Sequence, residues 1–254
     1  MNFAREVKLV ADMILESKKV VALTGAGIST ESGIPDFRGP QGLWKQIDPR
    51  TSTIQFFRQF PDAFWQFIVT RLENIMRAEP NRAHYALAEL ERLGKLSCVI
   101  TQNVDGLHSK AGSKSVVELH GNMREAVCLS CRRVVSMEEA VSMAKRGHLP
   151  PRCDCGGILK PNVVLFNEPL PEDAYKRALL ESMRCDLMLV VGTSLQVYPA
   201  AYLPALAKQR GAKLVIINME PTPFDEAADV VIHTKAGEAL PAIVDIVKEG
   251  LSRS

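Results

Sequence analysis

Short apolar runs alternate along this chain with longer stretches whose apolar residues recur at helical spacing. The runs are rich in β-branched residues and apolar throughout, as expected of strands buried on both faces of a parallel sheet. We predict strands at residues 20–23, 96–101, 116–119, 187–191, 214–217 and 230–233, and helices at 2–17, 82–93, 172–183, 199–209 and 238–251. The alternation predicts an α/β fold with a doubly wound, Rossmann-like parallel sheet.

Two intervals interrupt this alternation. Residues 40–80 show no strand pattern and hold most of the Phe and Trp residues of the chain, while residues 121–165 hold four cysteines in two close pairs. We interpret the first as a helical insertion and the second as a zinc-ribbon module, which together form a smaller lobe. The larger, Rossmann-like domain then comprises residues 1–39, 81–120 and 166–254.

Length and composition agree with this organisation. A chain of 254 residues can hold one large core and a small satellite module. The net charge of +2 gives no reason to expect direct binding to nucleic acid. No apolar run approaches the roughly 20 residues that span a bilayer, and the first 19 residues have the pattern of an amphipathic helix, not of a signal peptide. We therefore expect no membrane partner.

The first predicted strand ends in the turn Gly25-Ala26-Gly27. A Gly-x-Gly turn between a buried strand and a helix lets the backbone approach a diphosphate, although such glycines often serve turns only. Thr30 occupies the position where a dinucleotide fingerprint has a third small residue. An acid, an aromatic ring and a base follow between two glycines, at Asp36, Phe37 and Arg38, and favour a nucleotide-binding loop.

Polar residues also follow four other predicted strands, at the sheet edge where α/β folds bind ligands. They are Gln102, Asn103 and Asp105, then His120, then the turn Gly192-Thr193-Ser194, which we expect to open a helix, and finally Asn218 and Glu220. Asn, Asp and Glu in such places can be simple caps or turn formers, and a single His is as often structural as a general base. Five strand ends with polar groups at one edge nevertheless favour a binding site.

The four paired cysteines have the spacing of a metal site. Cys128 and Cys131 are followed by Cys153 and Cys155, and four thiolates suit one tetrahedral zinc ion with no open position, hence a structural one. The alternative is two unrelated pairs of free thiols. Paired metal-binding cysteines also indicate a reducing compartment, so we expect a cytoplasmic protein. Cys98 and Cys185 lie beside apolar runs and are predicted core residues.

The ordered set of motifs resembles the sirtuin family, the NAD-dependent protein lysine deacylases, in its prokaryotic type and restricted to the catalytic core. The resemblance extends from about residue 20 to residue 241 and rests on GAGIS, GIPDFRG, TQNVD, HG, the four cysteines, KPNVVLF, GTSL and INMEP. It implies that NAD is consumed as a co-substrate, with one structural zinc ion.

The resemblance also implies roles for single residues. His120 would be the general base, with Asn103 orienting the ribose or a water molecule. NAD contacts would come from Gly25, Ala26, Gly27, Asp36, Phe37, Arg38, Gln102, Asn103, Asp105, Gly192, Thr193, Ser194, Asn218, Glu220 and Ala236. A peptide would pair with an edge strand at residues 160–166, through Val163, Val164, Leu165 and Phe166. Asn167 replaces the usual Gly after this strand and tolerates a left-handed backbone.

The implied reaction is deacetylation of acetyl-lysine in a protein or peptide, giving nicotinamide and O-acetyl-ADP-ribose. Members that remove succinyl groups carry Tyr-x-x-Arg where this chain has Ile68 and Arg71, so we expect an apolar acyl pocket. The alternatives are desuccinylation or another deacylation, mono-ADP-ribosyl transfer, and a zinc-ribbon module that binds NAD without catalysis. A hydride-transferring dehydrogenase has no use for the loop at residues 33–39. We expect a monomer.

Overall fold

Six parallel strands form the central sheet of the larger lobe in the computed structural model, which describes residues 3–40 and 42–253. The strands are β1 (Val20–Thr24), β2 (Cys98–Thr101), β3 (Val116–Glu118), β7 (Leu187–Val191), β8 (Lys213–Ile217) and β9 (Val230–Ile232). Their order, β3-β2-β1-β7-β8-β9, is that of a Rossmann fold, and it reverses between β1 and β7. The predicted doubly wound sheet is confirmed.

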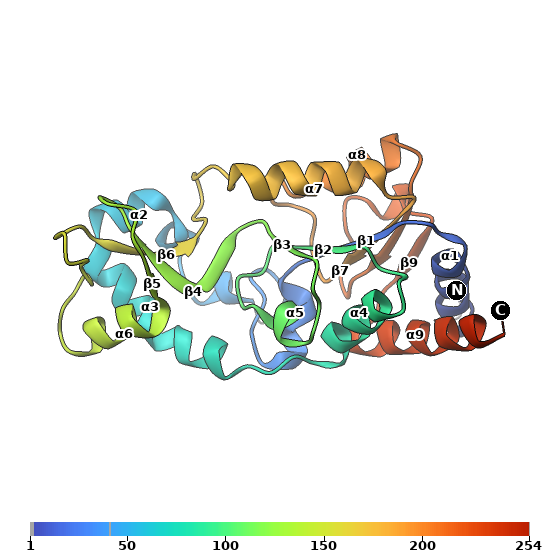
Figure 1. Ribbon diagram of the computed structural model, residues 1–254, viewed down its shortest axis with the longest axis horizontal. Helices are drawn as coiled ribbons and strands as arrows, with labels where there is room; N and C mark the ends of the chain where they lie inside the picture. Colours follow the sequence, from blue (N-terminus) through green and yellow to red (C-terminus); the bar gives the residue numbers. More distant parts are fainter. Residues whose placement is uncertain (1–2, 41, 254) are drawn as a thin grey trace.

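Helices cover both faces of this sheet (Figure 1). Along β7, Leu187 and Leu189 face one core and Met188 and Val190 face the other, as the period of two in a strand requires. The first core is closed by α1 (Phe3–Glu16), α4 (Arg82–Arg92) and α9 (Ala236–Ser252), and the second by α7 (Glu172–Arg184) and α8 (Tyr202–Gln209).

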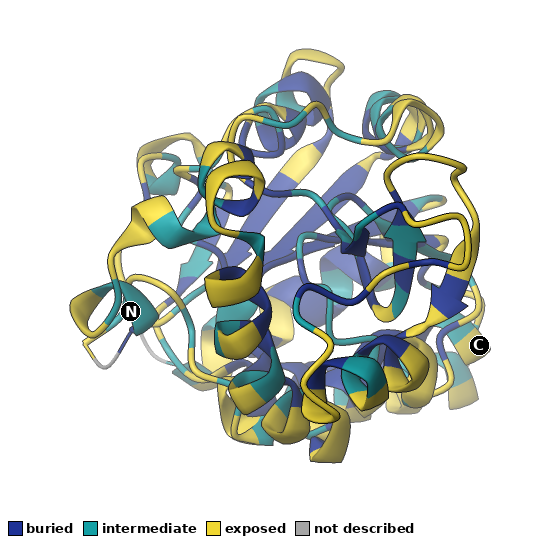
Figure 2. Ribbon diagram, turned by 90° about the vertical axis from the view of Figure 1, so that its left-hand side faces the viewer, coloured by how far each residue is buried: buried dark blue, intermediate teal, exposed yellow. Residues whose placement is uncertain are grey.

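The smaller lobe has a core of its own. An antiparallel sheet in the order β5-β4-β6 packs with three helices, and Figure 2 looks at the molecule from this end. The elements are β4 (Gly121–Cys128), β5 (Val134–Ser136), β6 (Leu159–Val163), α2 (Ile54–Gln59), α3 (Pro61–Arg77) and α6 (Met137–Lys145). Trp65 of α3 is fully buried, and its indole Nε1–H donates to the carbonyl of Leu159 at 2.9 Å. The two interrupting intervals therefore share one hydrophobic core.

Short helices connect these elements. They are the 3₁₀ segments η1 (Ala26–Ser32), η2 (Leu43–Lys45), η3 (Pro49–Ser52) and η4 (Asp225–Ala227), and the single turn α5 (Leu107–Lys110). No helix within the described ranges has both the length and the apolarity needed to cross a bilayer.

Several predicted boundaries are wrong. The turn Gly192-Thr193-Ser194 opens no helix, because Leu195 adopts a left-handed conformation (φ 53°) and the helix predicted at 199–209 begins only at Tyr202. The first glycine turn leads into the 3₁₀ segment η1, not into an α-helix. The strand predicted from residue 96 begins at Cys98, and the edge strand predicted at 160–166 ends at Val163.

Other limits differ by one or two residues, as helix and strand ends commonly do. The predicted helix start at residue 2 lies outside the described residues. The domain limits at residues 39/40, 80/81, 120/121 and 165/166 stay predictions.

Trp65 offers a test of the smaller core. We expect Trp65→Phe to lower the free energy of unfolding by about 2 kcal/mol, because it leaves a cavity and removes the donor to the Leu159 carbonyl. Phe60→Leu is the matched control, since Phe60 is 48% exposed and its truncation should cost less than about 0.5 kcal/mol. Urea unfolding monitored by circular dichroism measures both. Equal losses in the two variants would contradict this account of the core.

Candidate active site

A cleft of about 660 Å³ lies where the strands β1, β2, β3, β7 and β8 end and where the smaller lobe faces them. Every residue predicted for catalysis, NAD binding or substrate binding lines it. From the larger lobe these are Gly25, Ala26, Gly27, Asp36, Phe37, Arg38, Gln102, Asn103, Asp105, His120, Gly192, Thr193, Ser194, Asn218, Glu220 and Ala236. From the smaller lobe and its border they are Ile68, Arg71, Val163, Val164, Leu165 and Phe166.

Two glycine turns touch at the point where the strand order reverses. The N–H of Gly27 donates to the carbonyl of Gly192 at 2.8 Å. A Cβ at Gly27 would lie 2.9 Å from the Gly192 Cα, and one at Gly192 would lie 2.3 Å from the Ile28 nitrogen. Neither position accepts a side chain, so at both of them the cleft is lined by backbone, which a diphosphate can approach closely.

His120 sits where the chain passes from β3 to β4. Its Nδ1 lies 2.8 Å from the carbonyl of Gln102. Because a carbonyl only accepts, Nδ1 carries the proton and Nε2 has a free lone pair. Burial lowers the pKa of the imidazole, although the bond to Gln102 partly opposes this. His120 is therefore a neutral base at neutral pH. Gly121 beside it has φ 73°, and a Cβ there would meet the Asn162 oxygen at 2.1 Å.

Ser29 is the centre of a buried hydrogen-bond network that includes Asn103 and Asp105. Its hydroxyl donates to Asp105 Oδ2 at 2.7 Å and accepts from Asn103 Nδ2 at 3.1 Å. Asn103 Nδ2 also donates to the carbonyl of Gly25, and Asp105 Oδ1 accepts from the N–H of Leu107. Burial raises the pKa of Asp105, while its hydrogen bonds lower it. The network holds both polar side chains in fixed orientations at the cleft.

Two buried histidines complete this network, and sequence reasoning missed both. His84 Nδ1 accepts from the N–H of Asn81, so its Nε2–H faces the Ser29 hydroxyl at 3.5 Å. His108 Nε2 lies 2.9 Å from the Thr24 hydroxyl, and its ring packs against that of His84 at a tilt of 60°, with centroids 4.9 Å apart. The only sequence feature that could have pointed to His84 is Asn81 three residues before it, which is the spacing of a capping box at a helix N-terminus.

Both rings are held neutral by their surroundings. Burial lowers the pKa of His84 to about 4 and that of His108 to about 3, and His84 adds to the second shift. Within the described chain, His108 Nδ1 has no hydrogen-bond partner. Protonation of either ring would place a charge among apolar and neutral groups beneath the cleft.

Residues 36–40 and 43–44 line the cleft around Trp44. Asp36 Oδ1 accepts from the N–H of Gly39 at 3.0 Å, which closes a turn. The Phe37 ring lies 5.4 Å from the Trp44 ring, which in turn lies 5.5 Å from the Phe166 ring in the segment after β6. The Arg38 guanidinium stacks 4.1 Å from the Trp44 ring centroid. No carboxylate of the described residues pairs with Arg38, which leaves its donors available to an anion.

Hydrogen bonds also fix the other predicted NAD-binding residues along the cleft. Gln102 Nε2 donates to the Thr193 hydroxyl at 3.0 Å, which joins the ends of β2 and β7. Asn218 Nδ2 donates to the carbonyl of Glu220 at 2.7 Å, so this turn is fixed while the Glu220 carboxylate stays exposed. Ala236 begins α9, next to Gly237, whose N–H donates to the Glu31 carboxylate.

The segment after β6 crosses the cleft between the lobes. β6 is an edge strand, as predicted, and Val164 continues its path by donating to the carbonyl of His120 at 2.8 Å. Phe166 bonds through its N–H to Ser52 and through its carbonyl to Ile54. Asn167 has φ 69°, so the prediction of a left-handed residue here is confirmed.

The predicted acyl-pocket residues lie where α3 borders the cleft. Ile68 and Arg71 line the cleft there, together with Val104 and Met123. The Arg71 guanidinium lies over the Phe67 ring, 4.8 Å from its centroid, and burial lowers the pKa of Arg71. No side chain of the described residues forms an ion pair with Arg71.

The four paired cysteines converge in the smaller lobe. Their Sγ atoms all lie within 4.8 Å of one another, with Cys128 and Cys155 3.5 Å apart and Cys131 and Cys153 3.7 Å apart. Thiolates around one tetrahedral zinc ion stand about 3.8 Å apart, given a Zn–S distance of about 2.3 Å. The cluster therefore fits a zinc ion with all four positions filled, and such an ion would be structural. Cys98 and Cys185 are buried in the second core of the larger lobe, as predicted.

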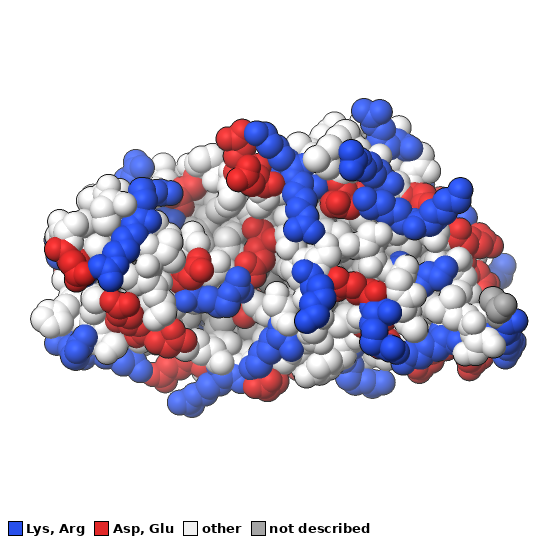
Figure 3. Space-filling view, viewed as in Figure 1, with Lys and Arg blue, Asp and Glu red and all other residues white. Residues whose placement is uncertain are grey.

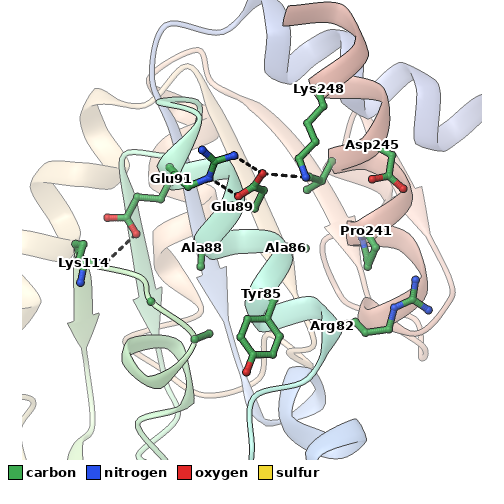
Figure 4. Close-up of a pocket in the computed structure, with 14 residues that line it drawn as sticks. Arg82, Tyr85, Ala86, Ala88, Glu89, Glu91, Lys114, Pro241, Asp245 and Lys248 are labelled. Atoms are coloured by element: carbon green, nitrogen blue, oxygen red, sulfur yellow. Dashed lines mark hydrogen bonds and ion pairs between the residues drawn. The ribbon is translucent and has the colours of Figure 1, made fainter. Parts of the chain in front are cut away.

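A larger hollow, of about 780 Å³, lies between α4 and α9 and contains none of the predicted residues (Figure 4). Three of its charged groups pair with one another: Glu89 pairs with Arg92 and Lys248, and these bonds lower the pKa of Glu89 to about 2. On the face drawn in Figure 3, Lys and Arg are interspersed with Asp and Glu. The cleft between the lobes remains the site with convergent chemistry.

Known proteins resemble this chain closely. The model of the Sir2 family matches residues 25–199. An NAD-dependent protein deacetylase of Sulfolobus acidocaldarius is 52% identical over 100% of both chains, and an NAD-dependent protein deacylase 2 of Archaeoglobus fulgidus is 49% identical over 96% of each. A solved structure of Sir2 with a p53 peptide and NAD⁺ is 42% identical, with a TM-score of 0.88, over 96% of this chain and 99% of that one.

The buried histidines predict acid sensitivity. Between pH 6.5 and about 4, His84 and His108 bind protons in the unfolded chain but stay neutral in the folded one. The free energy of unfolding therefore falls as pH falls. Each ring contributes up to about 1.4 kcal/mol per pH unit in this window. We expect His108→Gln, whose amide can still donate to Thr24, to flatten the decline in melting temperature between pH 6.5 and 4.5.

His148→Gln is the matched control, because His148 is exposed and its loss should leave the decline unchanged. Carboxylates with lowered pKa values contribute mainly below pH 4.5, outside this range. A decline that is the same in wild type and His108→Gln would show that the buried ring does not cause it.

Proposed function

The chain belongs to the Sir2 family and is an NAD-dependent protein deacetylase, and we propose that its cleft consumes NAD with His120 as the general base. One observation carries the proposal. A neutral His120 with a free Nε2 lines the same cleft as the bare glycine turns and the edge segment at residues 163–166. The proposal assigns the co-substrate to the larger lobe and the acetylated chain to the border between the lobes.

The residues around the switch point fit NAD. The backbone of Gly25, Ala26 and Gly27, the turn at residues 192–194 and the unpaired Arg38 would hold the diphosphate. Asn218 and Glu220 would contact the adenosine ribose, with Ala236 near the adenine. Gln102 would bond the second ribose and Asp105 the carboxamide. NAD supplies an anomeric carbon that loses nicotinamide and accepts the acetyl oxygen of the substrate.

The residues nearest the reaction have separate tasks. His120 Nε2 would take a proton from a ribose hydroxyl, and the bond from Nδ1–H to Gln102 stabilises the ring in the required tautomer. Phe37 would cover the reacting centre and exclude water. Asn103 would orient the ribose or a water molecule, because Gly25 and Ser29 fix its amide. Each task uses a group whose orientation is set before substrate arrives.

The smaller lobe would serve the protein substrate. An acetylated lysine would enter between α3 and the segment at residues 163–166, where backbone pairing reads side chains loosely. The four cysteines would hold one zinc ion that stabilises the lobe without taking part in the reaction. We propose domain limits at residues 39/40, 80/81, 120/121 and 165/166, a monomer, and a cytoplasmic location, the last because paired metal-binding thiols suit a reducing compartment.

An assay with an acetyl-lysine peptide and NAD tests the function. We expect mass spectrometry to detect free lysine peptide, nicotinamide and O-acetyl-ADP-ribose in equal amounts. His120→Ala should reduce kcat/KM by about 10²–10⁴-fold, the usual contribution of a general base, and leave ADP-ribose binding intact. Since burial lowers the pKa of His120, the acidic limb of the wild-type profile should lie below pH 6.5.

Two results would contradict this assignment. ADP-ribose attached to protein, without O-acetyl-ADP-ribose, would indicate a mono-ADP-ribosyltransferase. Unchanged turnover in His120→Ala would remove the proposed base. Loss of ADP-ribose binding in that variant would instead show that His120 shapes the nucleotide site.

The acyl pocket predicts substrate preference. We expect higher kcat/KM for acetyl-lysine than for succinyl-lysine peptides, because Ile68, Val104 and Met123 make the pocket apolar. Ile68→Tyr adds a hydroxyl near Arg71 and should shift the ratio toward succinyl by about tenfold. Ile68→Phe adds similar bulk without the hydroxyl and serves as the control. Faster turnover of the succinylated peptide by wild type would overturn the assignment of this pocket.

A further inference from the structure

The segment that would bind the peptide is held by two charged side chains that lie outside it. Lys160 Nζ donates to the carbonyl of Val163 at 2.6 Å. Glu168 Oε2 accepts from the N–H of Leu165 at 2.8 Å, and the two charged groups lie 2.8 Å apart. The Lys160 side chain is only 10% exposed and that of Glu168 24%. Ammonium and carboxylate thus form one partly enclosed unit around the segment.

The backbone groups of the segment differ in their hydrogen bonds according to the direction in which they point. Successive residues of an extended chain point their N–H and C=O groups in opposite directions. The Lys160 side chain bonds to the carbonyl of Val163, and the Glu168 side chain bonds to the N–H of Leu165. The carbonyl of Leu165 also accepts from the backbone N–H of Glu168. Val164 faces the other way, donates to His120, and has a carbonyl without a hydrogen bond to any described residue.

A charged pair at this position needs a reason other than stability. Enclosed ion pairs are often no more stabilising than apolar residues of the same size. An edge segment, however, presents N–H and C=O groups that require polar partners or pair with whatever chain arrives. Pro161 in β6 has no backbone N–H, and the Lys160–Glu168 pair bonds to two further backbone groups, the Val163 carbonyl and the Leu165 N–H. Fewer N–H and C=O groups of this edge therefore remain open to another chain.

We propose that Lys160 and Glu168 are positioning residues that set the segment at residues 163–166 for the acetylated peptide. The inference rests on the proposed function of the cleft. The pair does not orient the base, because the His120 ring is fixed by Gln102 of the larger lobe. Breaking the pair therefore affects peptide binding, while the NAD site and the base keep their geometry.

Lys160→Met and Glu168→Gln test the proposal. Lys160→Met removes the donor to Val163 and should raise the Kd and KM for an acetyl-lysine peptide about tenfold, which equals about 1.4 kcal/mol. Glu168→Gln keeps an oxygen for the Leu165 N–H and, being isosteric, should raise them by only about threefold. In both variants kcat and the KM for NAD should stay within twofold of wild type. Calorimetry gives the peptide Kd without any turnover.

Glu73→Gln is the matched control, since the Glu73–Lys145 pair joins α3 to α6 in the same lobe with both side chains half exposed. It should leave all constants unchanged. A lower melting temperature with an unchanged peptide Kd would show a purely structural pair and overturn the proposal, as would equal increases for peptide and NAD. Peptide binding without O-acetyl-ADP-ribose formation in wild type would refute the proposed function alone.

Discussion

The contact between two glycine turns is the constraint on which the rest of the site depends. Gly27 and Gly192 touch backbone to backbone at the point where the strand order reverses, and neither accepts a Cβ. The contact joins the ends of β1 and β7, neighbouring strands paired over five residues from Val20 to Thr24. At these two positions only backbone lines the cleft, and polar groups from the other strand ends lie around it.

His120 links this part of the cleft to the second lobe. Its ring is bound to Gln102 of the large sheet, while its carbonyl accepts from Val164 of the segment beside the small sheet. The proposed base is thus placed where the chain leaves one lobe for the other, and it bonds to a residue on each side of that border. Since Gly121 follows with a left-handed backbone and no room for a Cβ, the crossing itself has little conformational freedom.

Sequence patterns could predict the strands, the order of the motifs and the residues of the cleft, because each depends on local periodicity or on strand ends. A buried apolar run such as residues 187–191, with predicted helices before and after it, indicates a strand of a parallel sheet. The network of His84, His108 and Ser29 could not be predicted, since its members are far apart in the chain and meet only through packing. Leu195 likewise keeps the turn at residues 192–194 from opening the expected helix, through a left-handed conformation that its residue type disfavours.

Thr30 shows why the first turn serves cleavage better than hydride transfer. Where a dinucleotide fingerprint has a small residue packing a helix on the sheet, the Thr30 hydroxyl donates to the carbonyl of Gly27 at 2.9 Å. The 3₁₀ segment then ends at Gly33 with φ 82°. The chain leaves the sheet there and continues as the loop over the cleft, which brings Phe37 and Trp44 toward Phe166. In the proposed reaction this loop would cover the reacting carbon and exclude water.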